Sequence, residues 1–246
     1  MKEEVKVQEE LPKETAKRLT QEYFDSIPSF KWQKVLGTGK KYTPRTGHEC
    51  LFYKEKIYLF GGMDDDDRRN DLYSFDIFTN NWDKMIAQGD VPSPRSGARG
   101  VAFNDFLYFF GGYSKQSAEY YEDLFRYDLT RRRWEALSDN GEKPSKRTDH
   151  SMVLYGNSLF VFGGYDGQNR FGDLYKCSLA KSFKWKLVKT QGESVPLNRF
   201  GHCAIVVQHS MIIFGGWNGH DTMDDLYYFS FGNNLPLYKF SIKYMV

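Results

Sequence analysis

The sequence predicts an all-β fold made of four copies of one repeated unit. Gly-Gly pairs recur at intervals of 50, 52 and 52 residues, and a fixed period of this size is the signature of a repeat architecture. Aromatic residues make up 17% of the chain and accompany 22 glycines, a composition that favours strands and tight turns over helix bundles. The pairs are Gly61 and Gly62, Gly111 and Gly112, Gly163 and Gly164, and Gly215 and Gly216.

Other residues keep the same register as the glycines. An arginine stands 16 residues before the first glycine of every pair, and an Asp-Leu pair follows that glycine after 10 to 12 residues. A tryptophan follows the first three pairs by 21 to 23 residues. Several markers in one register indicate that every copy folds in the same way. The markers are Arg45, Arg95, Arg147 and Arg199; Asp71, Asp123, Asp173 and Asp225; and Trp82, Trp134 and Trp185.

Each unit predicts four short strands, because runs of β-branched and aromatic residues are bounded by Gly, Asn and Asp. In the first unit these runs are residues 48–53, 56–60, 71–76 and 81–86. The second run is apolar on both faces, as expected for a strand inside a stack of sheets. The glycine pair that ends it lets the backbone adopt angles that a Cβ forbids. Four-stranded units repeated around a centre describe a β-propeller.

The repeated pattern resembles that of the kelch-repeat family. It consists of Arg, a His or small residue three positions later, an apolar strand, Gly-Gly, Asp-Leu-aromatic and Trp, and it covers roughly residues 30–231. The long connectors "GDVPSPR" and "GEKPSKR" between Trp and Arg are similar to those of Rab-effector and leucine-zipper-like-regulator kelch proteins. The resemblance implies a kelch β-propeller.

Four Gly-Gly markers predict an incomplete or open propeller, because kelch propellers usually close with about five to seven blades. A closed ring of four blades is the alternative. Trp32 stands 13 residues before Arg45, as Trp82 does before Arg95, and predicts a lone fourth strand that would complete the last blade if the two ends paired. Tyr238 lies on a weaker candidate for the same strand. Open ends expose apolar blade faces, so self-association is expected.

Three segments are expected along the chain. Residues 1–28 form a charged tail, either loose or a short amphipathic helix. Residues 29–231 form the propeller, in units near 29–81, 82–133, 134–184 and 185–231. Residues 232–246 form an atypical tail that could supply a weak closing strand.

Candidate partner-binding residues gather at one edge of every unit. The first and second strands are antiparallel neighbours, so the start of one meets the end of the other. The motif arginines therefore share a face with the residues after Gly-Gly, and arginine and aromatic side chains are typical of protein-binding surfaces. The resemblance implies that these positions line the pocket of kelch propellers that bind acidic peptides. They are Arg45, Arg95, Arg147, Arg199, Met63, Tyr113, Tyr165 and Trp217.

A structural role is the open alternative for each arginine, since it could bridge blades through carboxylates or carbonyls. The glycine pairs and the four tryptophans, Trp32 included, are interpreted as structural. His48, His150 and His202 follow their arginines by three residues, which predicts packing or hydrogen bonding in each blade. No metal site or cofactor is predicted, because ligands at equivalent positions of different blades diverge.

Composition excludes several partner classes. The chain has 34 basic and 32 acidic residues. A net charge of +2 supplies no strong electrostatic field that would attract a nucleic acid. Three cysteines without a metal spacing suit a reducing compartment. No segment approaches the roughly 20 apolar residues of a membrane span. We therefore expect a cytoplasmic protein, with the nucleus as the alternative.

The leading functional hypothesis is a non-catalytic interaction module, an adaptor or scaffold that binds a protein through its loop face. An acidic peptide and a small GTPase are the expected partner classes. One alternative is a metal-dependent or small-molecule enzyme that uses the central channel. The other is a truncated kelch fragment without independent function.

Overall fold

The computed structural model describes residues 32–65, 67–180, 182–190 and 195–232. This part of the chain is all β, and it holds no helix long and apolar enough to cross a membrane. The chain divides into Met1–Leu36 and Gly37–Val246, and every strand of the described residues lies in the second unit. The predictions for residues 1–28, for Tyr238 and for most of the C-terminal tail fall outside the described residues.

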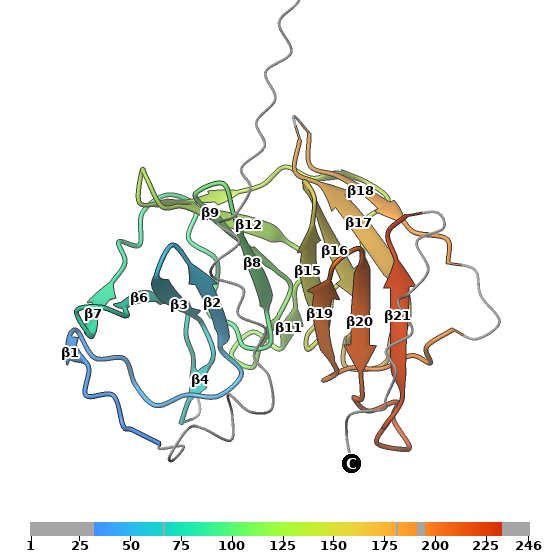
Figure 1. The fold of residues 1–246 in the computed structure, drawn as a ribbon, viewed down its shortest axis with the longest axis horizontal. Helices are drawn as coiled ribbons and strands as arrows, with labels where there is room; N and C mark the ends of the chain where they lie inside the picture. Colours follow the sequence, from blue (N-terminus) through green and yellow to red (C-terminus); the bar gives the residue numbers. More distant parts are fainter. Residues whose placement is uncertain (1–31, 66, 181, 191–194, 233–246) are drawn as a thin grey trace, which may run out of the picture. The chain divides into compact units, whose positions relative to one another are not determined.

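Each repeat forms one antiparallel sheet, which we call a blade, in the order of its strands along the chain (Figure 1). The first blade contains β2 (Glu49–Tyr53), β3 (Lys56–Phe60), β6 (Leu72–Asp76) and β7 (Asn81–Lys84). The second contains β8 (Arg99–Phe103), β9 (Phe106–Phe110), β12 (Leu124–Asp128) and β13 (Arg133–Ala136). The third contains β15 (Ser151–Tyr155), β16 (Ser158–Phe162), β17 (Leu174–Ser178) and β18 (Lys184–Leu187).

The fourth blade has three strands in the described part of the chain: β19 (Cys203–Val207), β20 (Ser210–Phe214) and β21 (Leu226–Ser230). The first strands of successive blades are neighbours, β2 beside β8, β8 beside β15, and β15 beside β19. These inner strands therefore lie towards the centre of the propeller, and the tryptophan strands lie outermost (Figure 1). The all-β propeller of four blades that the sequence predicts is confirmed.

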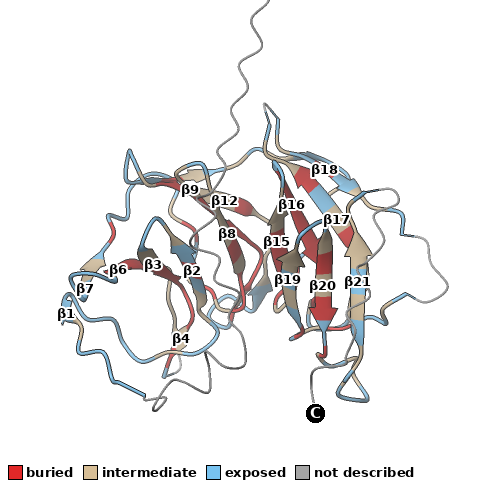
Figure 2. Ribbon diagram, viewed as in Figure 1, coloured by how far each residue is buried: buried red, intermediate tan, exposed pale blue. Residues whose placement is uncertain are grey.

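The core lies between blades rather than inside any one of them. One apolar cluster joins the first two blades, a second joins blades two and three, and a third joins blades three and four. The second and third strands carry most of the buried residues (Figure 2). Trp134 shows the arrangement, since its ring lies 5.1 Å from that of Phe60 in the preceding blade and 5.6 Å from that of Phe109 in its own. Each blade is therefore stabilised by its neighbours.

Connectors between blades add parallel strands that the sequence did not predict. β1 (Thr38–Gly39) pairs with β7, and β14 (Asn140–Gly141) pairs with β18. A bridge from Gly89 to Trp134 occupies the same place in the second blade. The strands that carry Trp82, Trp134 and Trp185 pair with β6, β12 and β17. The predicted units have their boundaries near residues 81, 133 and 184, where the second strand of each pair begins. Each blade therefore extends across a predicted boundary.

The glycine pairs end the second strands for the reason that the sequence suggests. Gly111 has a φ of +67°, and a Cβ there would stand 2.5 Å from the carbonyl oxygen of Arg147 in the next blade. The following glycine, Gly112, donates its N–H to that same carbonyl at 2.9 Å. The pair is thus the point at which one blade contacts the next too closely for a side chain.

The propeller is open in this structure. Gly62, Gly112 and Gly164 each donate a backbone hydrogen bond to the motif arginine of the following blade, but no such bond joins Gly216 to Arg45 among the described residues. The prediction of a strand at Trp32 falls partly outside the described residues. Its described part, residues 32–36, forms no strand, and the Trp32 side chain is fully exposed.

Candidate functional site

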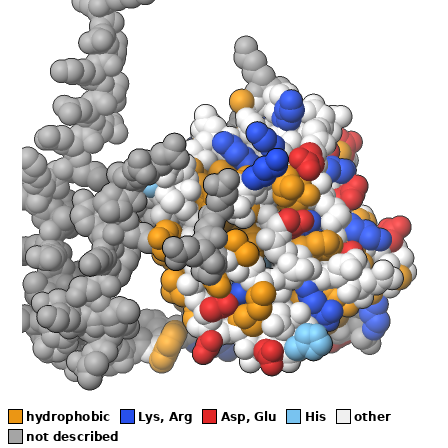
Figure 3. Space-filling view, turned by 90° about the vertical axis from the view of Figure 1, so that its right-hand side faces the viewer, with side chains coloured by type: hydrophobic (Ala, Val, Ile, Leu, Met, Phe, Trp, Pro, Cys, Tyr) orange, Lys and Arg blue, Asp and Glu red, His pale blue; other side chains and the backbone are white. Residues whose placement is uncertain are grey.

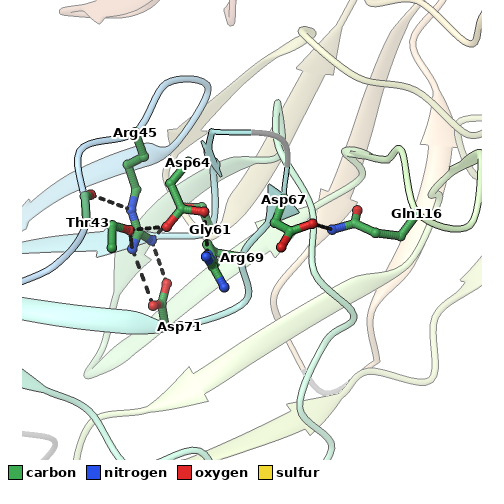
Figure 4. Close-up of polar contacts among 8 residues, drawn as sticks. All are labelled: Thr43, Arg45, Gly61, Asp64, Asp67, Arg69, Asp71 and Gln116. Carbon is green, nitrogen blue, oxygen red and sulfur yellow. Dashed lines mark hydrogen bonds and ion pairs between the residues drawn. The ribbon is translucent and has the colours of Figure 1, made fainter.

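The motif arginines form buried clamps within their blades. Arg45 donates from Nη1 to the carbonyl oxygen of Gly61 at 2.9 Å and to Asp71 at 2.5 Å, and its Nη2 reaches the second oxygen of Asp71 at 3.3 Å (Figure 4). Its side chain is 1% exposed. The acidic residue before each Leu is therefore the partner of the motif arginine, a role that the sequence register left unassigned.

The other three arginines repeat this clamp. Arg95, Arg147 and Arg199 are at most 2% exposed, and each bonds the carbonyl of its own Gly-Gly pair and both oxygens of its own aspartate. Aromatic rings cover two of them closely, Tyr121 at 3.9 Å from Arg95 and Phe171 at 4.3 Å from Arg147. Because these donors are buried and engaged, the arginines are not available to a partner in this structure. The geometry supports a structural role, but the side chains bond carboxylates and carbonyls of their own blade and do not bridge blades.

The repeated histidines pack against the preceding blade. The ring of His150 lies 5.4 Å from that of Phe110, and the ring of His202 lies 5.3 Å from that of Phe162. His202 Nε2 also shares a 2.8 Å hydrogen bond with Ser151 Oγ. Burial, followed by the charge of the neighbouring arginines, lowers the pKa of His202 to about 4 and that of His150 well below its ordinary value. The predicted packing role is confirmed for His150 and His202.

The loops after the glycine pairs form one face, which we call the loop face. Two of these loops are hairpins, β4 (Met63–Asp64) with β5 (Asp67–Arg68) and β10 (Tyr113–Ser114) with β11 (Glu119–Tyr120). The residue after each motif arginine bridges to the residue after each Gly-Gly pair, so the two sets do meet at one edge. These bridges join Thr46 to Met63, Ser96 to Tyr113, Thr148 to Tyr165, and Phe200 to Trp217.

Aromatic rings on the loop face form a continuous row across blades two, three and four, which we call the ladder. Tyr113 lies 4.6 Å from Tyr120, and Tyr120 lies 6.0 Å from Tyr165 of the next blade. The row continues through Phe200 to Trp217, with centroid distances of 5.1 and 5.4 Å. Burial, with smaller effects from Tyr165 and Tyr113, raises the pKa of Tyr120, so its phenol stays neutral.

Two arginines extend the ladder. Arg68 lies 5.2 Å from the ring of Tyr113 and donates from Nε to Ser96 at 3.2 Å. Arg170 lies between two rings, 5.2 Å from Tyr165 and 5.1 Å from Trp217. Neither guanidinium has an ion pair among the described residues, and Arg68 Nη1 and Arg170 Nε lack any hydrogen-bond partner there. Both groups are therefore oriented by stacking, and each has one buried nitrogen without a hydrogen-bond partner in the described part of the chain.

Of the sequence-predicted site residues, the structure brings Tyr113, Tyr165 and Trp217 together in the ladder. Met63 lies on the same face, opposite Arg68 in the first hairpin. Four further residues of this face were not predicted from the sequence: Arg68, Tyr120, Arg170 and Phe200. A signal existed: Arg68 and Arg170 both stand five residues after a post-glycine position, and Phe200 directly follows a motif arginine.

The alternative of a metal centre gains no candidate from the described residues, which contain no group of three or more His, Cys, Asp and Glu side chains able to hold an ion. Within the same residues, the three cysteines are free, with Cys177 buried and Cys50 and Cys203 exposed.

Comparison with known proteins gives consistent matches. The KLHDC2/KLHL20/DRC7 Kelch-repeats domain matches residues 13–155 and 97–236. Leucine-zipper-like transcriptional regulator 1 of Homo sapiens is 34% identical over 197 residues, which cover 76% of this chain and 23% of that protein. Host cell factor of Drosophila melanogaster is 29% identical over 251 residues, which cover 85% of this chain and 17% of that protein.

A third relative, Kelch domain-containing protein 10 of Homo sapiens, is 32% identical over 110 residues, which cover 44% of this chain and 24% of that protein. The chain thus spans a quarter or less of the length of these relatives. The domain match covers most of the chain, and the four blades, glycine pairs and arginine clamps lie within it. The chain therefore belongs to the kelch-repeat family.

Proposed function

We propose that this chain is a non-catalytic kelch adaptor or scaffold that binds an extended, acidic peptide segment of a partner protein along its ladder. The observation that carries the proposal is the unbroken row of rings from Tyr113 to Trp217, with stacked arginines, on the loop face. The shared kelch repeats of the relatives support a protein-interaction module.

Aromatic and arginine side chains favour a protein ligand. They bury a large area at a low cost in conformational entropy and are enriched at the energetic centres of protein interfaces. Trp217 is 37% exposed, so its ring can gain further burial when a partner docks. Rings held by their neighbours lose little freedom on binding, which favours affinity.

The two unpaired guanidiniums favour an acidic ligand. Arg68 and Arg170 lack a carboxylate partner in the described part of the chain, and a planar guanidinium binds a carboxylate through two parallel hydrogen bonds. A peptide is favoured over a small GTPase because the rings form a narrow row, which suits an extended segment better than the broad surface of a folded domain. Loops that carry binding residues on a rigid scaffold are a common arrangement.

The proposal is tested by selecting ligands from a displayed library of random peptides. We expect the wild-type protein to enrich peptides that contain Asp or Glu beside apolar residues. The double substitution Tyr165→Ala and Trp217→Ala should weaken binding of those peptides by at least about tenfold, since each lost hot-spot ring costs on the order of 1–2 kcal/mol. Fluorescence anisotropy measures the change.

Phe78→Ala is the matched control, because Phe78 is 71% exposed in the turn between β6 and β7, at the far end of the strands from the loop face. Its affinity for the selected peptides should equal that of the wild type. Selected peptides that bind the double variant as tightly as the wild type would contradict the proposal. Arg170→Gln separates the charge from the rings, and it should reduce binding of acidic peptides more than binding of their amidated forms.

A further inference from the structure

The two ends of the blade array carry complementary unmet hydrogen bonds. Between neighbouring blades, the N–H of the second glycine in each pair donates to the carbonyl oxygen of the motif arginine in the next blade. The three distances, from Gly62, Gly112 and Gly164, are 2.9, 2.9 and 2.8 Å. In the described part of the chain, the Gly216 N–H and the Arg45 carbonyl are the donor and acceptor that make no such bond. The fourth blade therefore presents the surface that the first blade is shaped to follow.

The outer face of the fourth blade is apolar and uncovered. Ile205, Phe214 and Leu226 are 57%, 50% and 64% exposed. Their counterparts in the third blade, which the fourth blade covers, are Val153, Phe162 and Leu174, at 7%, 5% and 4%. Figure 3 views the side on which β18 and β21 lie in Figure 1, and it shows hydrophobic side chains among charged ones there. Another blade would bury this face.

A cavity of about 420 Å³ lies between blades three and four, at the place that a tryptophan of the fourth strand fills in the other blades. Its lining includes Phe162, Ile213 and Phe229. Their equivalents two repeats earlier are Phe60, Phe109 and Tyr127. The rings of those three residues surround Trp134, with centroid distances of 5.1, 5.6 and 5.2 Å. No described strand pairs with the outer edge of β21. The site therefore suits a fourth strand that carries an indole.

The segment around Trp32 has the register of such a strand. In the described blades, a glycine seven residues after one tryptophan pairs with the strand that carries the next tryptophan. Gly89 follows Trp82 in this way and pairs with Trp134, and Gly141 follows Trp134 and pairs with Trp185. Trp32 likewise stands seven residues before Gly39, which pairs with Trp82. By this spacing, Trp32 belongs to the fourth strand of a blade that precedes the first.

We propose that the chain binds a second copy of itself head to tail, with the first blade of one copy against the fourth blade of the other. The Trp32 segment of each copy pairs with β21 of its partner and places its indole in the cavity. Since both copies offer the same two ends, the same contact made twice gives a closed two-fold dimer.

Two exposed cysteines provide the test. Glu49 and Gly100 make a contact between the first two blades, in which Glu49 Oε1 accepts from the Gly100 N–H at 3.0 Å. Glu49 stands four residues after its motif arginine, and Gly100 stands five residues after the next one. At the open ends, Cys203 holds the first of these positions and Cys50 holds the second, and both cysteines are exposed. The proposed interface therefore brings Cys203 of one copy beside Cys50 of the other.

The full chain is treated with a short bismaleimide, and the products are separated by mass and mapped by peptide analysis. We expect a Cys50 to Cys203 link in a species of twice the chain mass of 28.8 kDa, absent from the Cys203→Ser variant. A Cys50 to Cys203 link within one chain would overturn the proposal in favour of a closed ring of four blades. The absence of any such link, with a monomeric mass by light scattering, would also overturn it.

Exposed substitutions keep the test independent of folding. Leu226→Glu places a charge on the open face, and Trp32→Ala removes the indole; each should raise the dissociation constant of the dimer at least tenfold in light scattering, with unchanged circular dichroism. Phe78→Glu, an equally exposed aromatic outside both ends, should leave the dimer intact. A dimer that tolerates Leu226→Glu and Trp32→Ala would contradict the proposed interface.

Discussion

The motif arginines combine two tasks that a sequence motif cannot separate. The guanidinium of each clamps the aspartate and the glycine carbonyl of its own blade, and the main-chain carbonyls of Arg95, Arg147 and Arg199 also accept a hydrogen bond from the blade before. The buried guanidinium is surrounded by acceptors, so its desolvation is compensated by charge-assisted hydrogen bonds. The repeated arginine is thus a structural residue of the described blades.

Removing one clamp should destabilise the protein strongly. Arg147→Met leaves Asp173 and the Gly163 carbonyl without their partner. We expect a loss of about 3 kcal/mol in the free energy of unfolding, the lower end of the roughly 3–5 kcal/mol for a broken buried pair, because Asp173 is 28% exposed. Urea denaturation monitored by tryptophan fluorescence measures it.

Two comparisons isolate the clamp from general effects of losing an arginine. Arg131→Met removes a side chain that is 72% exposed and paired only at 3.8 Å, so it should change stability by less than about 0.5 kcal/mol. Arg147→Lys keeps the charge but not the two-pronged geometry, so it should remain destabilising. Equal effects of the Arg147 and Arg131 substitutions would argue against the clamp.

The buried histidines should make stability fall in mild acid. The unfolded chain protonates a histidine near pH 6.5, whereas His202 in the folded chain does so only near pH 4. Between these values the unfolded state binds more protons, so the free energy of unfolding decreases as pH falls, by about 2 kcal/mol at pH 5 for this residue. His150 acts in the same direction.

His202→Gln should therefore weaken the pH dependence by about 2 kcal/mol between pH 7 and pH 5, because it removes one titrating group from both states. Denaturation curves at the two pH values, with wild type beside variant, give the comparison. A variant whose stability falls as steeply as that of the wild type would show that His202 is not the group responsible.

At the scale of elements, the turn after each second strand depends on the next blade. Gly111→Ala should cost about 1–3 kcal/mol more than the same change at Gly156, since both have positive φ but only Gly111 faces a backbone oxygen at 2.5 Å. A methyl group at Gly156 would meet no heavy atom within 4 Å, so this substitution measures the cost of φ alone. Equal costs would show that blade contact does not require the glycine.

The second strands could be predicted to the residue, because each is an apolar run bounded by a turn on one side and Gly-Gly on the other. β3 occupies the predicted range, 56–60, and β9, β16 and β20 end at their Gly-Gly pairs in the same way. The two-residue strands β1 and β14 could not be predicted, because so short a segment shows no alternation of apolar and polar residues. Trp32 fits the repeat spacing, but residues 32–36 form no strand in the described part of the chain.

The candidate site was only partly predictable for a similar reason. The positions after Gly-Gly identify Tyr113, Tyr165 and Trp217, because strand direction alone places them on one face. Tyr120 and Arg170 enter the ladder through pairing across their hairpins. Such pairing depends on loop length, and the loops differ between repeats. Whether an arginine is clamped or free depends on the nearby carboxylates, which the spacing of arginines does not reveal.

At the scale of the molecule, the contacts that join blades support the loops that carry the ladder. Clamps, histidines and apolar clusters join successive blades, so each described blade relies on its neighbours as in other repeat proteins. The loops that this scaffold holds in register carry the ladder across three blades. This arrangement, in which a rigid scaffold positions residues on its connecting loops, supports the proposed binding of a peptide along the ladder.

The central claim, that the ladder is the partner-binding surface, is tested most directly by photo-crosslinking. A benzoyl-phenylalanine in place of Trp217 should form covalent adducts with a library-selected acidic peptide, and excess unlabelled peptide should suppress them. The same residue in place of Phe78 should form none. Equal labelling at both positions, or labelling at Trp217 that excess peptide leaves unchanged, would contradict the account.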